Sequence, residues 1–150
     1  MKIVLQKVSH ASVVVNSKVI SSIKNGYFLL VGITTEDTMD DIEKLSRKVV
    51  NLRIFGDEPD GFWKKNIKEV QGEILSVSQF TLCARTKKGT KPDFHLAQRG
   101  HIAKELYNNF LKLLGDSIGP EKVQDGEFGA MMSCSLTNEG PITILLDSKE

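Results

Sequence analysis

The densest group of chemically active side chains lies in the segment Ser78-Gln79-Phe80-Thr81-Leu82. Hydroxyl and amide groups interrupt a stretch, residues 73–82, whose other residues favour a strand. Buried groups of this kind are costly unless they are hydrogen-bonded, so they serve either a structural network or a polar ligand. In the second interpretation Ser78 and Thr81 act as nucleophile or proton relay, and backbone N–H groups at the strand end receive an oxyanion. The spacing alone leaves both interpretations open.

A basic segment follows directly. Residues 85–91 carry four positive charges and no acid, contributed by Arg85, Lys87, Lys88 and Lys91. Such a run is commonly a solvated loop, but its place beside the polar segment suits a phosphate-bearing substrate such as an RNA end. Phe94, just beyond it, either stacks on a base or fills the core.

Gly140-Pro141 forms part of a tight connection between two expected strands. In the cis isomer, a Gly-Pro bond would aim two backbone carbonyls in one direction. X-Pro bonds prefer the trans isomer in general, and the residues themselves do not decide between the two.

Common catalytic constellations are absent from the sequence. It contains no Walker loop, no dinucleotide-binding G-x-G-x-x-G, no H-E-x-x-H and no G-x-S-x-G. His95 and His101 form a weak pair, fewer ligands than the three or four that zinc needs. Cys83 and Cys134 lie far apart and are interpreted as reduced core residues. We therefore expect neither a metal nor another cofactor.

The elements that must position these residues follow from periodicity and turn signals. Residues 2–15 alternate apolar with polar, which suits a half-buried strand pair, and residues 16–18 form a hairpin turn into a strand over 19–23. Asn25-Gly26 is a strong turn signal before residues 27–33, an apolar run that predicts a central strand. Further strands are expected over 53–56, 73–82, 130–136 and 142–146, and Phe62 and Trp63 are expected in the core.

Two helices are expected between the early and late strands. Thr38 and Asp41 resemble a capping box before an apolar stripe of about three turns. The second helix spans residues 97–114 and is closed by Gly115. Because the pattern lacks regular βαβ alternation, it predicts an α+β fold with a mixed, largely antiparallel, barrel-like sheet and two main helices.

Length and composition limit the class of protein. The chain has 150 residues, 40% of them hydrophobic, and 20 Lys+Arg against 19 Asp+Glu give a net charge of +1. These values predict a single domain over residues 1–150 and exclude disorder and coiled coil. Near neutrality argues against a protein that coats DNA, since such affinity needs many neutralised phosphates. The alternating N-terminal residues are neither a signal peptide nor a membrane span, so we expect a cytoplasmic protein.

Taken together, the motifs resemble the D-aminoacyl-tRNA deacylase family over essentially the whole chain. Ser78-Gln79-Phe80-Thr81-Leu82 matches the family's SQxTL motif, and Asn138-x-Gly140-Pro141-x-Thr143 matches its NxGPxT motif. Two short motifs in the right order and separation are far more specific than either alone. The resemblance also includes the opening residues 1–15, the central strand before Gly32, Lys88-Gly89-x-Lys91-Pro92-x-Phe94 and Phe128-Gly129-Ala130-Met131-Met132.

The resemblance implies an enzyme that hydrolyses the ester joining a D-amino acid, or glycine, to the 3′ terminal adenosine of tRNA. L-aminoacyl-tRNA would be left intact. It implies a homodimer in which a cis Gly140-Pro141 enters the partner's pocket and excludes L side chains. It places Met132 and Phe94 with Gly140 and Pro141 in substrate binding, Thr81, Ser78, Gln79 and Phe80 in catalysis, and the basic segment in tRNA binding.

Two mechanisms and two rival functions remain open from the sequence. The 2′-hydroxyl of the terminal adenosine activates water while the SQxTL residues position the ester, or Thr81 attacks covalently without a histidine near it in sequence. The rival functions are a non-catalytic module that binds an RNA end, and a deacylase of small D-aminoacyl esters that needs no tRNA. No partnership with DNA or a membrane is expected.

Overall fold

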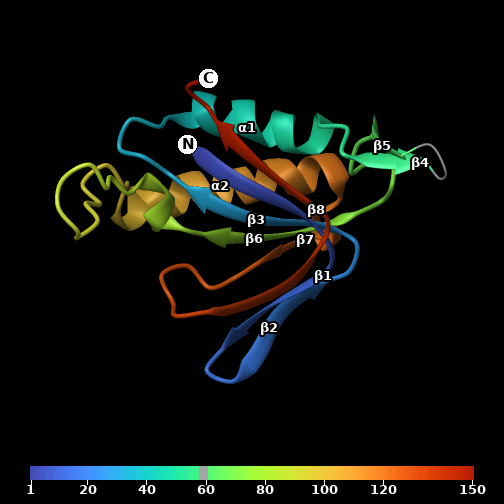
Figure 1. Ribbon diagram of the computed structural model, residues 1–150, viewed down its shortest axis with the longest axis horizontal. Coiled ribbons are helices and arrows are strands. Elements are labelled where there is room, and N and C mark those ends of the chain that lie inside the picture. The colour runs from blue at the N-terminus through green and yellow to red at the C-terminus, as the bar shows by residue number, and fades with distance from the viewer. Residues whose placement is uncertain (58–60) are drawn as a thin grey trace.

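The computed structural model describes residues 1–57 and 61–150. A curved mixed sheet carries two helices, α1 and α2, on one of its faces (Figure 1). In chain order the elements are β1 (Lys2–Val15), β2 (Lys18–Ile23), β3 (Gly26–Gly32), α1 (Met39–Asn51), β4 (Phe55–Asp57), β5 (Gly61–Lys65), β6 (Glu73–Ser78), η1 (Phe80–Cys83), α2 (Gly100–Ile118), η2 (Pro120–Lys122), β7 (Val123–Asp125) and β8 (Ser133–Asp147).

The main sheet is built around β1. Its strands follow the order β2-β1-β3-β6-β7, and β8 pairs with the other edge of β1. β1 is antiparallel to β2, β3 and β8, whereas β3 is parallel to β6 and β6 to β7. The prediction of a mixed, largely antiparallel, barrel-like sheet with two helices is confirmed.

Residues 2–15 form one continuous strand and not a strand pair. The register of β1 against β8 shifts on either side of Val8, and β1 changes its partner from β3 to β2 beyond that point. Ile3 and Leu5, before the shift, belong to the core beneath the helices. Val8 and Val13 belong to a second core, formed with residues of β2, β3 and β6. A bend at a register shift lets one strand serve two cores, because it re-aims the side chains that follow it.

Both predicted helices are present, but the second begins at Gly100 and not at residue 97, and it also ends later than predicted. Thr38 and Asp41 form the expected capping box at the start of α1. The second helix runs past Gly115 to Ile118 and ends at Gly119, which has a φ of 106°. Gly115 lies inside the helix and does not end it. A β-carbon at this position would stand 3.2 Å from the Cα of Pro120, so glycine is favoured here because it allows Pro120 to pack closely.

Three further predictions were wrong in part: two concern the burial of side chains, and one concerns where a strand begins. Phe62 and Trp63 are not in the core; they are 47% and 58% exposed on β5, in a hairpin with β4 outside the main sheet. Cys83 is buried as predicted, but Cys134 is exposed, and both are free thiols. The strand expected over 53–56 begins at Phe55. Among the described residues, no helix is long and apolar enough to cross a membrane.

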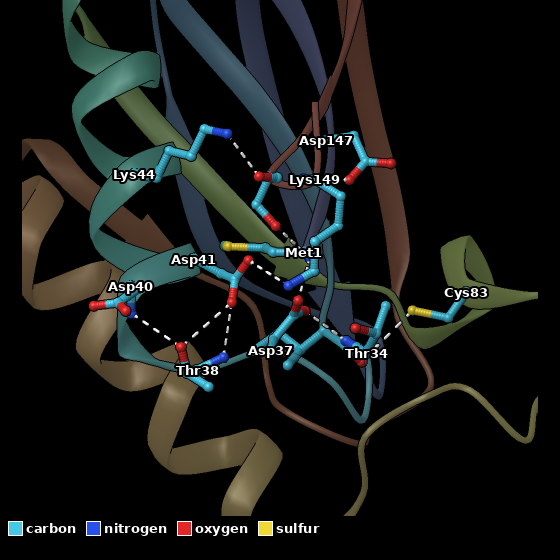
Figure 2. A network of polar contacts seen from close by, with 12 residues as sticks. Met1, Thr34, Asp37, Thr38, Asp40, Asp41, Lys44, Cys83, Asp147 and Lys149 are labelled. Carbon is cyan, nitrogen blue, oxygen red and sulfur yellow. Dashed lines mark hydrogen bonds and ion pairs between the residues drawn. The ribbon is translucent and has the colours of Figure 1, made fainter.

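A buried polar network ties the first residue to the loop before α1 (Figure 2). The α-ammonium of Met1 pairs with Asp37 and donates to Ser148 Oγ at 2.8 Å. The other oxygen of Asp37 accepts the Thr34 N–H at 2.7 Å. Burial opposes ionisation of the nearby Asp41, but hydrogen bonds from the Thr38 N–H, Ser148 and Lys149 outweigh it and hold the pKa of that carboxyl well below its usual range. The Met1 ammonium and the Asp37 carboxylate therefore hold the N-terminus against the loop before α1, beside the main core.

Candidate active site

The polar segment singled out in the sequence lies where β6 ends. Only its first residue, Ser78, is in the strand, and Phe80–Cys83 turn into the short helix η1. The Gln79 N–H donates to the Val31 carbonyl at 2.7 Å, which seats the turn on the end of β3. Gly32 permits this contact, since a β-carbon there would stand 2.9 Å from Leu82 Cβ and 3.1 Å from the Gln79 carbonyl oxygen.

A cavity of about 630 Å³ opens beside this turn. Ser78, Gln79 and Phe80 form one side of it, and the start of α2 and residues 128–132 form others. Its lining includes two residues predicted for substrate binding, Met132 and Phe94. A single chain therefore supplies a cavity large enough for a small organic ligand.

Thr81 is exposed and is not among the residues that line the cavity. Its hydroxyl Oγ1 accepts a hydrogen bond of 2.7 Å from Nε2 of Gln79, which does line it. Within the described part of the chain, no other side chain is hydrogen-bonded to the Thr81 hydroxyl. A carboxamide is not a base at neutral pH, so Gln79 orients Thr81 but cannot take its proton.

A second hollow, of about 1040 Å³, lies next to the cavity. We call it the basic groove. Phe94 and Arg99 line both spaces, and Phe94 also packs edge-on against Phe80 with ring centroids 5.2 Å apart. The groove contains all four basic residues predicted to bind tRNA, which are Arg85, Lys87, Lys88 and Lys91. The structure thus places the predicted basic segment beside the predicted polar turn.

The wall of the groove is fixed by local hydrogen bonds. Arg85 and Asp93 exchange two backbone bonds, of 2.8 and 2.9 Å, which close the basic loop at its base. The Asp93 carboxylate accepts the His95 N–H at 2.8 Å and lies 2.7 Å from His95 Nδ1. These two hydrogen bonds from His95 hold the pKa of Asp93 below its usual value, and the bond from the backbone N–H contributes most.

A buried polar network supports β6 from behind. The Tyr107 hydroxyl of α2 donates to Asp125 of β7 at 2.6 Å and lies 3.1 Å from Ser76 Oγ of β6. Burial raises the pKa of Tyr107, with a further contribution from the Asp125 carboxylate, and burial also raises the pKa of Asp125. Three elements are thereby joined two residues before Ser78.

Gly140 and Pro141 lie elsewhere on the chain. The NxGPxT motif does not separate two strands; it is an excursion within β8, between the pairs Val8↔Asn138 and Gln6↔Thr143. The Gly140–Pro141 peptide is cis. Asn138 bridges the excursion, accepting the Ile142 N–H and donating to Thr143 Oγ1, both at 2.8 Å. Both motif residues are exposed, and neither lines the cavity or the basic groove of its own chain.

Sequence reasoning missed the residues that complete the two hollows. Gln98, Arg99 and Gly100 fall within the range expected for the second helix and were not predicted for the site, yet all three line the cavity. His95 was weighed only as a metal ligand, and the structure places it in the groove. Their position shortly after the basic segment was the one feature of the sequence that could have pointed to them as site residues. In the described ranges, no group of three or more His, Cys, Asp or Glu side chains is placed to hold a metal ion.

The structure thus combines a barrel-like α+β fold with a polar turn, a cavity of small-molecule size and an adjoining basic groove. A family model described as D-Tyr-tRNA(Tyr) deacylase matches residues 4–147. The chain belongs to the D-aminoacyl-tRNA deacylase family, as its motifs predicted, and its class is that of a hydrolase.

Relatives and solved structures agree over the full chain. The D-aminoacyl-tRNA deacylase of Saccharomyces cerevisiae is 76% identical and covers 100% of both chains. Human D-aminoacyl-tRNA deacylase 1 is 47% identical over 99% of this chain and 70% of that protein. A structure described as the c-Myc DNA unwinding element binding protein has a TM-score of 0.93 at 47% identity, covering 98% of each chain. One described as a probable eukaryotic D-amino acid tRNA deacylase has a TM-score of 0.85 at 17% identity over 97% of each chain, and it shows the fold alone.

Proposed function

We propose that this protein hydrolyses the ester between a D-amino acid and the 3′ terminal adenosine of tRNA, with glycyl-tRNA as a second substrate, and leaves L-aminoacyl-tRNA intact. The observation that carries the proposal is that the cavity and the basic groove share Phe94 and Arg99 in their walls. An aminoacyl ester is small and partly apolar, whereas the RNA that bears it is a polyanion. The adjoining spaces match these two parts in size and charge.

The function is tested by charging tRNA with D-Tyr, L-Tyr or glycine and following release of the amino acid with and without the protein. We expect release of D-Tyr and glycine to accelerate and L-Tyr to stay at its spontaneous rate. Binding of the charged tRNA without ester loss would instead support the alternative, a non-catalytic module for an RNA end. Equal release of D-Tyr from tRNA and from a simple D-Tyr ester would favour a deacylase that needs no tRNA.

For the mechanism we propose that the 2′-hydroxyl of the terminal adenosine helps to activate water, while Ser78, Gln79, Phe80 and Thr81 position the ester. Backbone N–H groups of the turn stabilise the developing oxyanion. The bond between Gln79 and Thr81 supports this route over covalent attack, because the hydroxyl accepts from a carboxamide and, among the described residues, no base is hydrogen-bonded to it. Thr81 is then a positioning residue.

Two changes separate the routes. With a substrate that ends in 2′-deoxyadenosine, kcat is expected to fall by about 10²–10⁴-fold, because a positioned proton-transferring group usually accelerates a reaction by that factor. Thr81→Ala is expected to lose only about tenfold, the worth of one net hydrogen bond, and Thr81→Ser to keep most activity. Undiminished turnover of the deoxy substrate would refute the RNA-assisted route. Loss of all D-selective turnover in Thr81→Ala, with rescue by Thr81→Ser, would establish covalent attack.

We propose further that the protein acts as a cytoplasmic homodimer in which Gly140 and Pro141 of one subunit enter the partner's cavity and exclude L side chains. Their exposure and their position outside their own chain's hollows support this assignment. They also lie on β8, whose pairing within the described residues is with β1 alone, so its other edge is open to a second copy. Full D-selective activity in a species shown by sedimentation to be monomeric would contradict the proposal.

A further inference from the structure

We propose that the basic groove binds the phosphates of the nucleotides immediately before the terminal adenosine, and that His95 and Arg99 belong to this subsite together with the basic segment. The inference rests on the proposed function and deepens it. It divides the substrate between two spaces, with the aminoacyl end in the cavity and the sugar-phosphate chain in the groove.

The basic groove carries a strong excess of positive charge. Arg85, Lys87, Lys88, Lys91 and Arg99 line the groove, and the single carboxylate among its lining residues is that of Asp93. That carboxylate is already held by two bonds from His95, one from its backbone and one from its ring. The basic side chains are exposed and have no hydrogen-bonded carboxylate of their own among the described residues. A hollow lined in this way attracts a polyanion and not a neutral ligand.

The imidazole ring of His95 is held in a fixed orientation. Its Nδ1 lies 2.7 Å from the Asp93 carboxylate, and its side chain is 89% exposed. A carboxylate bonded to Nδ1 fixes the ring and leaves Nε2 directed at solvent. Because the Asp93 carboxylate and the loop-closing backbone bonds to Arg85 hold this wall in place, His95 is presented to the groove on a fixed support.

The cavity and the basic groove share part of their walls. Phe94 and Arg99 line both spaces, so a substrate that occupies both the cavity and the groove runs past these two side chains. An aromatic ring suits a base at that crossing, and a guanidinium suits the phosphate next to it. Arg99 is also the N-cap residue directly before α2, and no side chain makes a capping hydrogen bond at that end of the helix. At about 1040 Å³, the groove has room for a ligand of at least nucleotide size.

Direct binding tests the subsite apart from catalysis. The probe is a fluorescent oligoribonucleotide with the sequence of the single-stranded tRNA 3′ end, titrated against the wild type, Arg99→Ala and the double variant Lys87→Ala/Lys88→Ala. We expect each variant to bind roughly tenfold more weakly, and the slope of log Kd against log salt to flatten by about one for each phosphate that is no longer neutralised. Lys112→Ala, which removes the same charge from an exposed site on α2 outside the groove, is the matched control and should bind like the wild type.

Kinetics supply the second arm. For each variant, kcat/KM is measured on D-Tyr-tRNA and on D-Tyr-adenosine, which lacks the upstream phosphates. We expect the ratio of kcat/KM on D-Tyr-tRNA to kcat/KM on D-Tyr-adenosine to fall roughly tenfold in the groove variants, because their KM for the tRNA substrate rises. The ratio should stay constant in Lys112→Ala.

Unchanged oligonucleotide affinity in both groove variants would overturn the subsite, and so would an equal loss on the two substrates. If the wild type shows no D-selective release from either substrate, the proposed function fails. The binding arm still decides the subsite in that case.

Discussion

Replacing Gly32 with alanine is expected to lower kcat/KM for D-aminoacyl-tRNA roughly 10–100-fold, although Gly32 lies outside both motifs. Its added β-carbon would stand 2.9 Å from Leu82 Cβ, 3.1 Å from the Gln79 carbonyl oxygen and 3.3 Å from Cys83 Sγ. Two of these neighbours belong to η1, and the third is the backbone of the residue that orients Thr81. The turn must therefore move by a few tenths of an ångström away from the end of β3.

A shift of this size is expected to lower activity as well as stability. Forcing an extra methyl group into a packed site costs about 1–3 kcal/mol. Steady-state kinetics and urea denaturation of Gly32→Ala together separate the two effects. The matched control is Ile42→Val in α1, a buried substitution expected to cost about 0.5–1.5 kcal/mol while leaving η1 untouched. Equal activity of Gly32→Ala and Ile42→Val would show that the turn does not position the ester.

Asp37→Asn is expected to destabilise the protein by about 3–5 kcal/mol, because it leaves the Met1 ammonium buried without a counter-charge. Both partners of the ion pair are fully buried, and Asp37 also accepts the Thr34 N–H (Figure 2). For a chain of this length the loss corresponds to a fall in Tm of roughly 6–20 °C. The measurement is thermal and urea denaturation of untagged protein. Glu36→Gln removes the same charge from the exposed neighbouring residue and should change stability by less than about 0.5 kcal/mol.

The same substitution also tests how the cavity is held. Residues 33–35 pair with residues 96–98 through the bonds Thr35 N–H to Leu96 carbonyl, 2.9 Å, and Gln98 N–H to Ile33 carbonyl, 2.8 Å. Ile33 and Gln98 line the cavity, so loosening the turn at Asp37 is expected to raise KM as well as lower stability. A variant with wild-type stability would mean that the ammonium is hydrated or has a second counter-charge, and would refute the assignment.

The local part of the fold was predictable because its signals are contained in short segments. The capping box of Thr38 and Asp41, the hairpin turn at 16–17 and the apolar run of β3 act over a few residues, and all were predicted. Phe62 and Trp63 were misplaced because exposure depends on what the rest of the chain covers. Gly115 was misread as a helix end because its reason for being glycine is the later residue Pro120.

For the site, the sequence was enough to identify the family and the candidate groups, but it left two mechanisms open. Its motifs identified the family, its polar segment provided the candidate positioning groups, and the basic segment concentrated charge in a chain whose net charge is only +1. The tertiary structure alone decided how these parts meet. It ended β6 at Ser78, seated the turn on Gly32, joined the cavity to the groove through Phe94 and Arg99, and placed Gly140 and Pro141 away from both. The physical reason is that residue types and local spacing are written along the chain, whereas a cavity is a property of surfaces that become neighbours only on folding.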